Sequence, residues 1–187
     1  GEISNNGVEI ELRAINITAG DFSWNGDFNI AFQKAKVDKL PDGTDVYAGH
    51  DNQYIYREGE DMWSFYLPEW AGVDPETGVG LYYVDRTVND DKTHIVGNAA
   101  RNIVGKATPD FLGGFSSTFA FKGIDLYFLI TYQFGADAFD YPGYFMRHDG
   151  NRLYSIMASK DVAGNYWTPE NRNAENPQPV YSPTYRT

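Results

Sequence analysis

The sequence predicts an all-β chain built from antiparallel strands, and two observations support this fold class. Aromatic residues make up 16% of the 187 residues, and 19 residues are glycine. Aromatic side chains fit a pleated sheet surface, and glycine favours the turns between strands. Four segments also alternate apolar and polar residues with a period of two, as strands with one apolar face do. We therefore expect strands and loops to dominate the chain.

The first two alternating segments are residues 7–17 and 22–34. Their apolar positions are Val8, Ile10, Leu12 and Ala14 in the first segment and Phe22, Trp24, Phe28, Ile30 and Phe32 in the second. The opposite face of the first segment carries Glu9, Glu11 and Arg13. We expect these side chains to face water rather than to form a catalytic set. A short turn containing Gly20 joins the two segments, which predicts a hairpin.

A second hairpin is predicted for residues 115–121 and 124–134, joined by Lys122 and Gly123. The apolar face holds Phe115, Ser117, Phe119 and Phe121 on one strand and Leu126, Phe128, Ile130, Tyr132 and Phe134 on the other. If the Gly20 turn lies at one end of a sheet, the alternating direction of antiparallel strands places the Gly123 turn at that same end. Phe22, Trp24, Tyr132 and Phe134 stand near strand ends, where membrane barrels carry girdles of aromatic residues.

The lengths of the connections favour a membrane barrel. About 80 residues separate the second strand from the third and about 50 follow the fourth, although connections that long are uncommon in compact soluble domains. Outer-membrane barrels have short periplasmic turns and long extracellular loops. We therefore predict two barrel hairpins, at residues 1–34 and 113–135. A long extracellular loop region at 35–112 follows the first hairpin and contains short strands near 53–57 and 81–84. A second extracellular loop region at 136–187 follows the second hairpin. A soluble β-sandwich gives the same alternation, so periodicity alone does not separate the two architectures.

Composition excludes several classes of function. The net charge of −11 argues against a nucleic-acid partner, which requires a basic surface. The chain has no cysteine, and its three histidines are scattered, so we predict neither a metal site nor a cofactor. The longest apolar run, about five residues near Leu126, is far too short for a spanning helix. The chain opens on Gly1 without a signal peptide, which leads us to expect that the sequence begins at a cut.

Four blocks of sequence resemble the SusC/RagA family of TonB-dependent transporters. The first joins NGVEIEL at 6–12 to DFSW at 21–24, and the second joins REGE at 57–60 to WAGVDPETG at 70–78. The third and most specific is GKATPDFLGGFSSTFAFKGIDLYFLITYQFG at 105–135, and the fourth is YWTPEN at 166–171. Because the blocks follow the family order over nearly the whole chain, the chain is identified as part of the C-terminal half of such a barrel.

The resemblance implies an outer-membrane importer of a Gram-negative bacterium that takes up oligosaccharides or peptides. Members of the family are expected to close about 22 strands around a plug, to couple to the TonB complex and to work with a SusD-like surface lipoprotein. The plug and the TonB box lie outside this sequence. The resemblance implies transport rather than catalysis. The alternative is a soluble all-β carbohydrate-binding module, with a β-rich enzyme as the third possibility.

The expected contact residues are aromatic side chains in the two long segments. They are Trp63, Trp70, Tyr82, Tyr83 and Trp167, whose flat rings suit stacking on sugars or contact with a lid protein. The competing interpretation is that these rings pack the loops against themselves.

We predict no catalytic and no metal-binding residue. Glu58, Glu60 and Asp61 form an acidic cluster of the kind that glycoside hydrolysis needs, but a solvated loop is the ordinary explanation. The calcium candidates lack the spacing of an EF-hand loop, which favours turn or cap roles; they are Asp38, Asp42, Asp45, Asp137 and Asp140.

Overall fold

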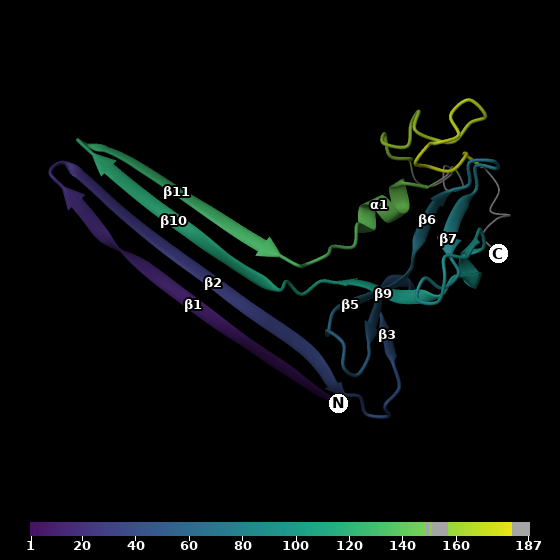
Figure 1. Ribbon diagram of the computed structural model, residues 1–187, viewed down its shortest axis with the longest axis horizontal. Coiled ribbons are helices and arrows are strands. Elements are labelled where there is room, and N and C mark those ends of the chain that lie inside the picture. Colours follow the sequence, from purple (N-terminus) through teal and green to yellow (C-terminus); the bar gives the residue numbers. More distant parts are fainter. Residues whose placement is uncertain (149, 151–156, 181–187) are drawn as a thin grey trace. The chain divides into compact units, whose positions relative to one another are not determined.

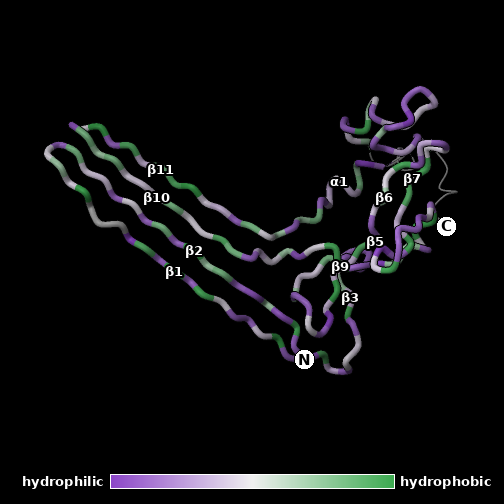
Figure 2. Tube along the Cα trace, in the orientation of Figure 1, coloured by the Kyte–Doolittle hydropathy of each residue, from purple (hydrophilic) through white to green (hydrophobic). Residues whose placement is uncertain are grey.

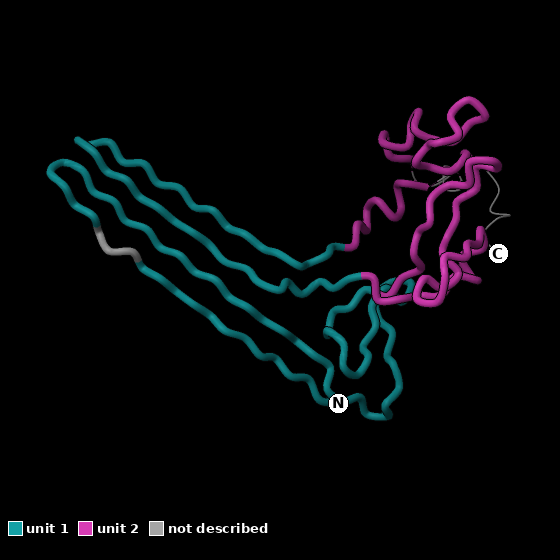
Figure 3. The backbone as a smooth tube through the Cα atoms, in the orientation of Figure 1, with its two compact units in different colours: residues 1–65, 105–138 teal, residues 66–104, 139–187 magenta. Residues whose placement is uncertain are grey.

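The computed structural model describes residues 1–148, 150 and 157–180, without the side chains of residues 14–16. The chain divides into two compact units (Figure 3). Unit 1 comprises Gly1–Phe65 and Gly105–Ala138, and unit 2 comprises Tyr66–Val104 and Phe139–Thr187. Each unit is described by itself below.

Unit 1 is dominated by a sheet of four antiparallel strands (Figure 1). The strands are β1 (Glu2–Ala19), β2 (Phe22–Lys39), β10 (Phe111–Phe121) and β11 (Ile124–Phe134), in the order β1-β2-β10-β11. The predicted all-β fold is confirmed, and each of the four alternating segments lies in one of these strands. β1 and β2 have 18 residues each, because polar residues continue both strands beyond the alternating segments.

The register places the apolar positions of all four strands on one side of the sheet. Val8 pairs with Phe32, Phe28 with Phe115, and Phe115 in turn with Ile130. Directly opposite residues of antiparallel strands share a face, so the apolar positions form one continuous surface. Figure 2 shows hydrophobic and hydrophilic residues interleaved along these strands. We call this surface the apolar face, made of Val8, Ile10, Leu12, Phe22, Trp24, Phe28, Ile30, Phe32, Phe111, Phe115, Phe119, Phe121, Ile124, Leu126, Phe128, Ile130, Tyr132 and Phe134.

The opposite side, which we call the polar face, carries mostly hydroxyl, amide and charged side chains, together with Leu112, Tyr127 and Leu129. Its members include Glu9, Glu11, Arg13, Asn25, Asp27, Asn29, Ser116, Thr118, Asp125, Thr131 and Gln133. Here the Arg13 guanidinium lies 3.1 Å from Glu11, and the Ser116 hydroxyl donates to Asp27 at 3.2 Å. The sheet therefore has one apolar face and one largely polar face.

Two-residue turns close both hairpins. Lys122 and Gly123 both have positive φ, 48° and 82°, as a type I′ turn requires, and Gly20 at 59° fills the first position of the other turn. The Lys122 amide donates to the Asp21 carbonyl at 3.4 Å. The two turns thus lie side by side at one end of the sheet, as strand parity predicted (Figure 1).

β10 begins at Phe111, four residues before the start that the sequence pattern predicted. The pattern did not extend that far because Gly113 and Gly114, which have no side chain, interrupt the alternation. Tyr132 of β11 reaches across β10 over Gly113, and its hydroxyl donates to the Asn29 carbonyl of β2 at 2.9 Å. A Cβ at Gly113 would stand 2.6 Å from the Tyr132 hydroxyl oxygen. The missing side chain therefore allows one ring to tie three strands together.

The hydrophobic core of unit 1 lies beyond the far end of this sheet. There β2 leaves β10 and bonds to another segment, with the Val37 amide donating to Glu60 at 3.0 Å and the Met62 amide to Ala35 at 3.1 Å. β3 (Val46–Ala48), η1 (His50–Asn52), β4 (Tyr54–Tyr56) and β5 (Ser64–Pro68) follow in this region, with β3 pairing to β4 and β4 to β5. The buried hydrophobic side chains of this core are Val37, Leu40, Ile55 and Phe65.

Unit 2 contains a small three-stranded antiparallel sheet and one short helix. Its elements are β6 (Trp70–Val73), β7 (Gly80–Tyr83), β8 (Lys92–Thr93), η2 (Val96–Asn98) and α1 (Tyr141–Met146), and β9 (Arg101–Lys106) leads the chain back to unit 1. Asp140 begins α1 by accepting a hydrogen bond from the Gly143 amide at 2.9 Å, next to Pro142 in the first turn. Among the described residues, no helix is both long and apolar enough to cross a bilayer.

Candidate functional site

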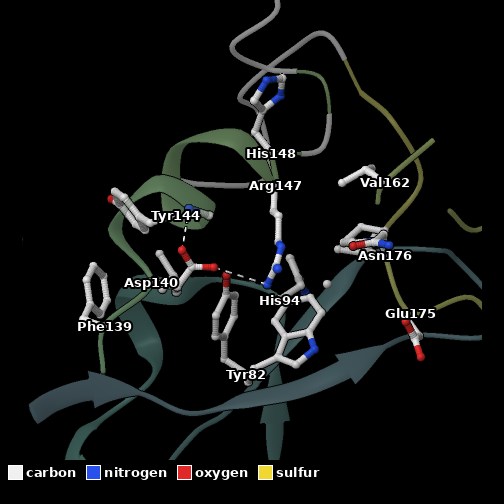
Figure 4. A pocket seen from close by; sticks show the side chains of 16 residues that line it. Tyr82, His94, Phe139, Asp140, Tyr144, Arg147, His148, Val162, Glu175 and Asn176 are labelled. Atoms are coloured by element: carbon white, nitrogen blue, oxygen red, sulfur yellow. Dashed lines mark hydrogen bonds and ion pairs between the residues drawn. The ribbon is translucent and has the colours of Figure 1, made fainter. Parts of the chain in front are cut away.

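Unit 2 contains an open cavity of about 610 Å³ (Figure 4). Strands β6 and β7 supply one wall and the segment around α1 supplies another. His94, Val96, Val162 and residues 175–177 complete the lining. The side chains combine aromatic rings with charged and amide groups. Pockets that bind small ligands commonly have this mixture, in which rings provide contact area and a few polar groups fix orientation.

Trp70 and Tyr82 form the aromatic wall. They are directly paired across β6 and β7, and their rings meet edge to face with centroids 5.3 Å apart at 80°. A Cβ at Gly80 would stand 2.7 Å from the Trp70 indole and 3.4 Å from Pro177. Glycine at this position therefore lets the indole lie close against β7. Trp70 remains 46% exposed, which leaves ring surface for a ligand.

Arg147 carries the positive charge of the cavity. Its guanidinium lies 3.6 Å from the Asp140 carboxylate and 3.7 Å from that of Asp161. The ion pair with Asp140 is drawn as a dashed line in Figure 4. All three side chains are more than half exposed, so these ion pairs orient the guanidinium but contribute little stability. Glu175, which also lines the cavity, accepts a hydrogen bond from the side-chain Nδ2 of Asn165 at 3.0 Å.

His148 is the buried polar residue of the cavity, with 4% of its surface exposed. Its Nδ1 accepts a hydrogen bond from the Gly150 amide at 3.1 Å. This hydrogen bond orients the imidazole ring. Within the described residues no three His, Cys, Asp or Glu side chains gather closely enough to hold a metal ion.

Of the five aromatic residues predicted to contact a ligand, the structure brings Trp70 and Tyr82 together in the cavity. Tyr83, the next residue along β7, lies under the Arg86 guanidinium at 4.7 Å and the Lys92 ammonium at 5.7 Å. Trp63 belongs to unit 1, where it meets Tyr54 and Tyr56 edge to face.

Trp167 supports the loop that contains the GVDPETG motif. Its indole Nε1 donates to the Pro75 carbonyl at 3.1 Å, and a Cβ at Gly78 would stand 2.5 Å from its ring. Gly78 also has a φ of 73°, a conformation that favours glycine. Its carbonyl accepts from the Gln178 amide at 2.9 Å, so the loop and the segment after Trp167 form one packed structure.

Asp74 closes this loop with four hydrogen bonds. Its carboxylate accepts from the Thr77 hydroxyl at 2.6 Å and the Glu76 amide at 2.9 Å, while its backbone bonds to Gly78 and Val79. The Thr77 hydroxyl, followed by the Glu76 amide, lowers the pKa of Asp74 because both stabilise the carboxylate. The motif thus encodes a loop held by its own hydrogen bonds.

The acidic residues that the sequence suggested as catalytic or calcium-binding candidates make local hydrogen bonds and ion pairs. Glu58 accepts from the Leu40 amide at 2.8 Å, and Asp61 accepts from the Trp63 amide at 3.0 Å and the Thr108 hydroxyl at 2.8 Å. Of the calcium candidates, Asp45 is paired to Arg57 at 2.8 Å, Asp137 accepts from the Lys106 amide at 3.1 Å and Asp140 caps α1.

Sequence reasoning missed the α1 side of the cavity, which contributes Tyr144, Arg147 and His148. A usable signal was present, since an aspartate followed two residues later by proline is typical of a helix start. The helix has only six residues, too few for a period of 3.6 to stand out in the sequence.

The apolar face of unit 1 is the second functional surface. Leu12 and Leu126 are each 59% exposed, Ile130 is 54% exposed and Ile124 is 73% exposed. Among the residues that the structure describes, no second sheet packs on this apolar surface. Exposed apolar surfaces of this extent mark contact with another protein or with a membrane.

Comparison with known proteins identifies relatives that share this sequence and this fold. No family model matches the sequence. The chain is 32% identical over 202 aligned residues to TonB-dependent receptor P3 of Formosa agariphila, covering 96% of the chain and 19% of that receptor. It is 25% identical to TonB-dependent receptor P39 of the same bacterium, covering 74% of the chain and 17% of the receptor. The chain thus spans about one fifth of these relatives.

Solved structures of the RagAB peptide transporter have the same fold over nearly the whole chain. One matches with a TM-score of 0.79 and 27% identity, covering 98% of this chain and 21% of that one. The RagAB peptide importer in the "open-open" state matches with a TM-score of 0.80 and 28% identity, covering 99% and 20%. The resemblance seen in the sequence motifs is therefore confirmed: in sequence and fold this chain corresponds to a segment of a TonB-dependent receptor of the SusC/RagA family.

Proposed function

We propose that this chain forms part of the wall and outer loops of a β-barrel importer in a Gram-negative outer membrane. The observation that carries the proposal is the continuous apolar face of the four-stranded sheet, most of whose leucine and isoleucine side chains are exposed within the described part of the chain. A soluble β-sandwich buries such a face under a second sheet, whereas a barrel strand turns it toward lipid. The exposed leucine and isoleucine side chains of β1 and β11 favour lipid.

The length of the apolar face supports the same assignment. Ten residues separate Phe22, beside the tight turns, from Phe32 at the other end. At about 3.3 Å per residue and a tilt of about 40°, they cross about 25 Å, the usual height of a barrel's apolar band. We assign Phe22 and Trp24 to the aromatic girdle at one interface and Tyr132 and Phe134 to the girdle at the other.

The orientation follows from the turns. Periplasmic turns of such barrels are short, so we place the Gly20 and Gly123 turns in the periplasm. Residues 1–34 and 113–135 then contain the membrane hairpins, and residues 35–112 and 136–187 lie outside the cell. In this arrangement the whole lining of the unit 2 cavity is extracellular.

We propose that the cavity contacts an oligosaccharide or a peptide during uptake. Trp70 and Tyr82 offer ring surfaces that stack on sugar rings or apolar side chains, and Arg147 offers planar donors to carboxylates. The RagAB structures are named as a peptide importer, which supports the peptide branch of this proposal. A SusD-like lipoprotein outside the membrane, and the TonB complex reached through other parts of the receptor, are the partners we propose.

The membrane assignment is tested by moving a positive charge from one face of β11 to the other. Ile130→Lys places an ammonium group on the apolar face, and Thr131→Lys places the same group one residue later on the polar face. A lysine facing the middle of the bilayer costs about 2–4 kcal/mol, whereas a lumen-facing one is tolerated.

We expect the receptor carrying Thr131→Lys to accumulate as folded barrel in outer-membrane fractions and the receptor carrying Ile130→Lys to be depleted from them. Equal accumulation of both variants would mean that the apolar face does not meet hydrocarbon. Recovery of the wild-type protein in the soluble fraction, as a monomer without detergent, would favour the soluble carbohydrate-binding module instead.

A further inference from the structure

A pair of lysines continues the apolar face beyond its outer aromatic girdle. On β2 the even-numbered positions 22–32 belong to the apolar face, and the same parity carries Lys34 and Lys36 onto that side of the strand. Their partners on β1, Asn6 and Ser4, are polar. The character of the surface therefore changes from aromatic to basic within two residues of Phe32.

The other side of this stretch is covered by the protein itself. Gln33 and Ala35 face Trp63 and Thr108 across a small cavity, and Val37 is 2% exposed. By contrast Lys34 is exposed and Lys36 is half-buried. The lysines are therefore directed away from the core of unit 1.

The charges of both lysines are available to an anion. Neither Lys34 nor Lys36 takes part in an ion pair within the described residues. Asp61 stands opposite Lys36, but its carboxylate accepts hydrogen bonds from the Trp63 amide and the Thr108 hydroxyl. Asp38 lies two residues farther along the strand. Lys34 is consequently the less compensated of the two, in a chain whose net charge is −11.

The spacing matches the headgroup layer of a membrane. Lys34 lies two residues beyond Phe32, about 7 Å along the strand, and Lys36 about 13 Å. With a strand tilt of about 40° these distances become about 5 and 10 Å above the hydrocarbon, and the headgroup layer on each side is about 5–7 Å thick. Flexible lysine stems span the remaining difference.

We propose that Lys34 and Lys36 bind the phosphate groups of the phosphorylated glycolipid that forms the outer leaflet. The inference rests on the proposed function, because it requires the apolar face to lie in the membrane with the tight turns inside. Lysine binds phosphate as a point charge, and the two side chains on successive outward positions of one strand present two such charges to the same leaflet. Asn6 and Ser4 add hydrogen-bonding groups beside them.

Native mass spectrometry of the detergent-solubilised receptor measures this binding directly. The probe is bisphosphorylated lipid A, compared with its dephosphorylated form and with phosphatidylglycerol. We expect retention of bisphosphorylated lipid A by the wild type to fall about fivefold for each lysine replaced by glutamine, since a basic side chain near an anionic surface contributes about one factor of that size. Lys34→Arg with Lys36→Arg should retain the lipid.

Lys122→Gln is the matched control, because it removes the same charge at the opposite end of the sheet. The proposal is overturned if Lys34→Gln with Lys36→Gln retains bisphosphorylated lipid A as the wild type does, or if Lys122→Gln loses it equally. Equal retention of phosphatidylglycerol would overturn the assignment to the glycolipid. The proposed function has its own test, the comparison of Ile130→Lys with Thr131→Lys. A receptor that inserts into the membrane but does not bind lipid A therefore refutes only the headgroup site.

Discussion

The Trp24 indole Nε1 donates a hydrogen bond of 2.7 Å to the Ser117 hydroxyl on the apolar face. Ser117 is 1% exposed, whereas Ser116 and Thr118 on either side of it are half-buried. Gly26, which pairs with Ser117, leaves room for the indole to lie over this position, since a Cβ there would stand 3.2 Å from Trp24. One ring thus shields a hydroxyl from the proposed hydrocarbon while satisfying its own N–H.

Ser117→Ala should destabilise the sheet by about 1–2 kcal/mol, because the Trp24 N–H loses its partner in an apolar environment. Ser116→Ala removes a hydroxyl from the next residue, on the polar face, and should change stability by less than about 0.5 kcal/mol. The measurement is the midpoint of heat-induced unfolding of the receptor in detergent. Equal midpoints for the two variants would contradict the assignment of the two faces.

A double-mutant cycle isolates the bond itself. Trp24→Phe and Ser117→Ala should be coupled by about 1 kcal/mol, so the double variant is less destabilised than the sum of the single ones. Additive effects would show that the contact contributes nothing beyond the packing of each side chain.

Gly78→Ala should disrupt the loop that contains the GVDPETG motif by about 2–5 kcal/mol, because it adds a clash with Trp167 to the cost of a positive φ. Gly164→Ala provides the control, since Gly164 has a φ of 79° but no atom within 4 Å of the added Cβ. Quenching of tryptophan fluorescence by acrylamide reports the release of Trp167. Quenching that rises equally in both variants would show that backbone strain alone accounts for the effect.

The carboxylate of Asp74 should stabilise its loop at neutral pH and lose this effect only in acid. Hydrogen bonds lower its pKa in the folded chain, so the contribution is present above the ordinary value of 3.8 and disappears as pH falls through the lower folded pKa. Thr77→Val should move the Asp74 pKa back toward that value, as followed by ¹³C NMR of labelled aspartates.

Asp85 offers an internal comparison for this titration. Its pKa is lowered by the Thr87 hydroxyl and amide. Thr87→Val should therefore shift Asp85 and leave Asp74 unchanged, while Thr77→Val does the reverse. A shift of both residues in either variant would point to a general loosening of unit 2.

Adjacent tyrosines on β7 test the cavity. Tyr82→Ala should weaken binding of the transported oligosaccharide or peptide about tenfold, because a stacked ring contributes roughly 1 kcal/mol or more. Tyr83→Ala removes an equal side chain that contacts Arg86 and Lys92 instead, and should leave binding unchanged. Isothermal titration with candidate ligands measures both. An equal loss in the two variants would place the ligand elsewhere.

The alternation of side chains was sufficient to predict the four long strands and their apolar face. It underestimated the strands where the pattern breaks: the glycines at 113 and 114 resemble a turn in sequence, but they make room for Tyr132 to cross the sheet. The polar stretches at the far ends of β1 and β2 carry no alternation to detect. Their strand conformation comes from pairing with each other.

The cavity was harder to predict because its walls are distant in sequence. Trp70 and Tyr82 share a hairpin, and their aromatic character was visible. Arg147 and Glu175 reach the same cavity only through the path of the chain after β11, which no local pattern specifies. The motif residues were informative in a different way, since Asp74, Gly78 and Trp167 hold a loop in place; the predicted ligand contact of Trp167 stays a prediction.

The exposure of the apolar face to hydrocarbon is tested most directly by a spin-label scan of β11 in the membrane-inserted receptor. The chain contains no cysteine, so single cysteines can be placed at each position from 124 to 131 without background from this segment. Oxygen partitions into hydrocarbon and a nickel chelate stays in water. We expect high oxygen and low chelate accessibility at Ile124, Leu126, Phe128 and Ile130, with lower oxygen accessibility at the odd-numbered positions between them. Low accessibility to both reagents at the even positions would show that protein covers this face, and high chelate accessibility there would show that it faces water; either result contradicts the importer account.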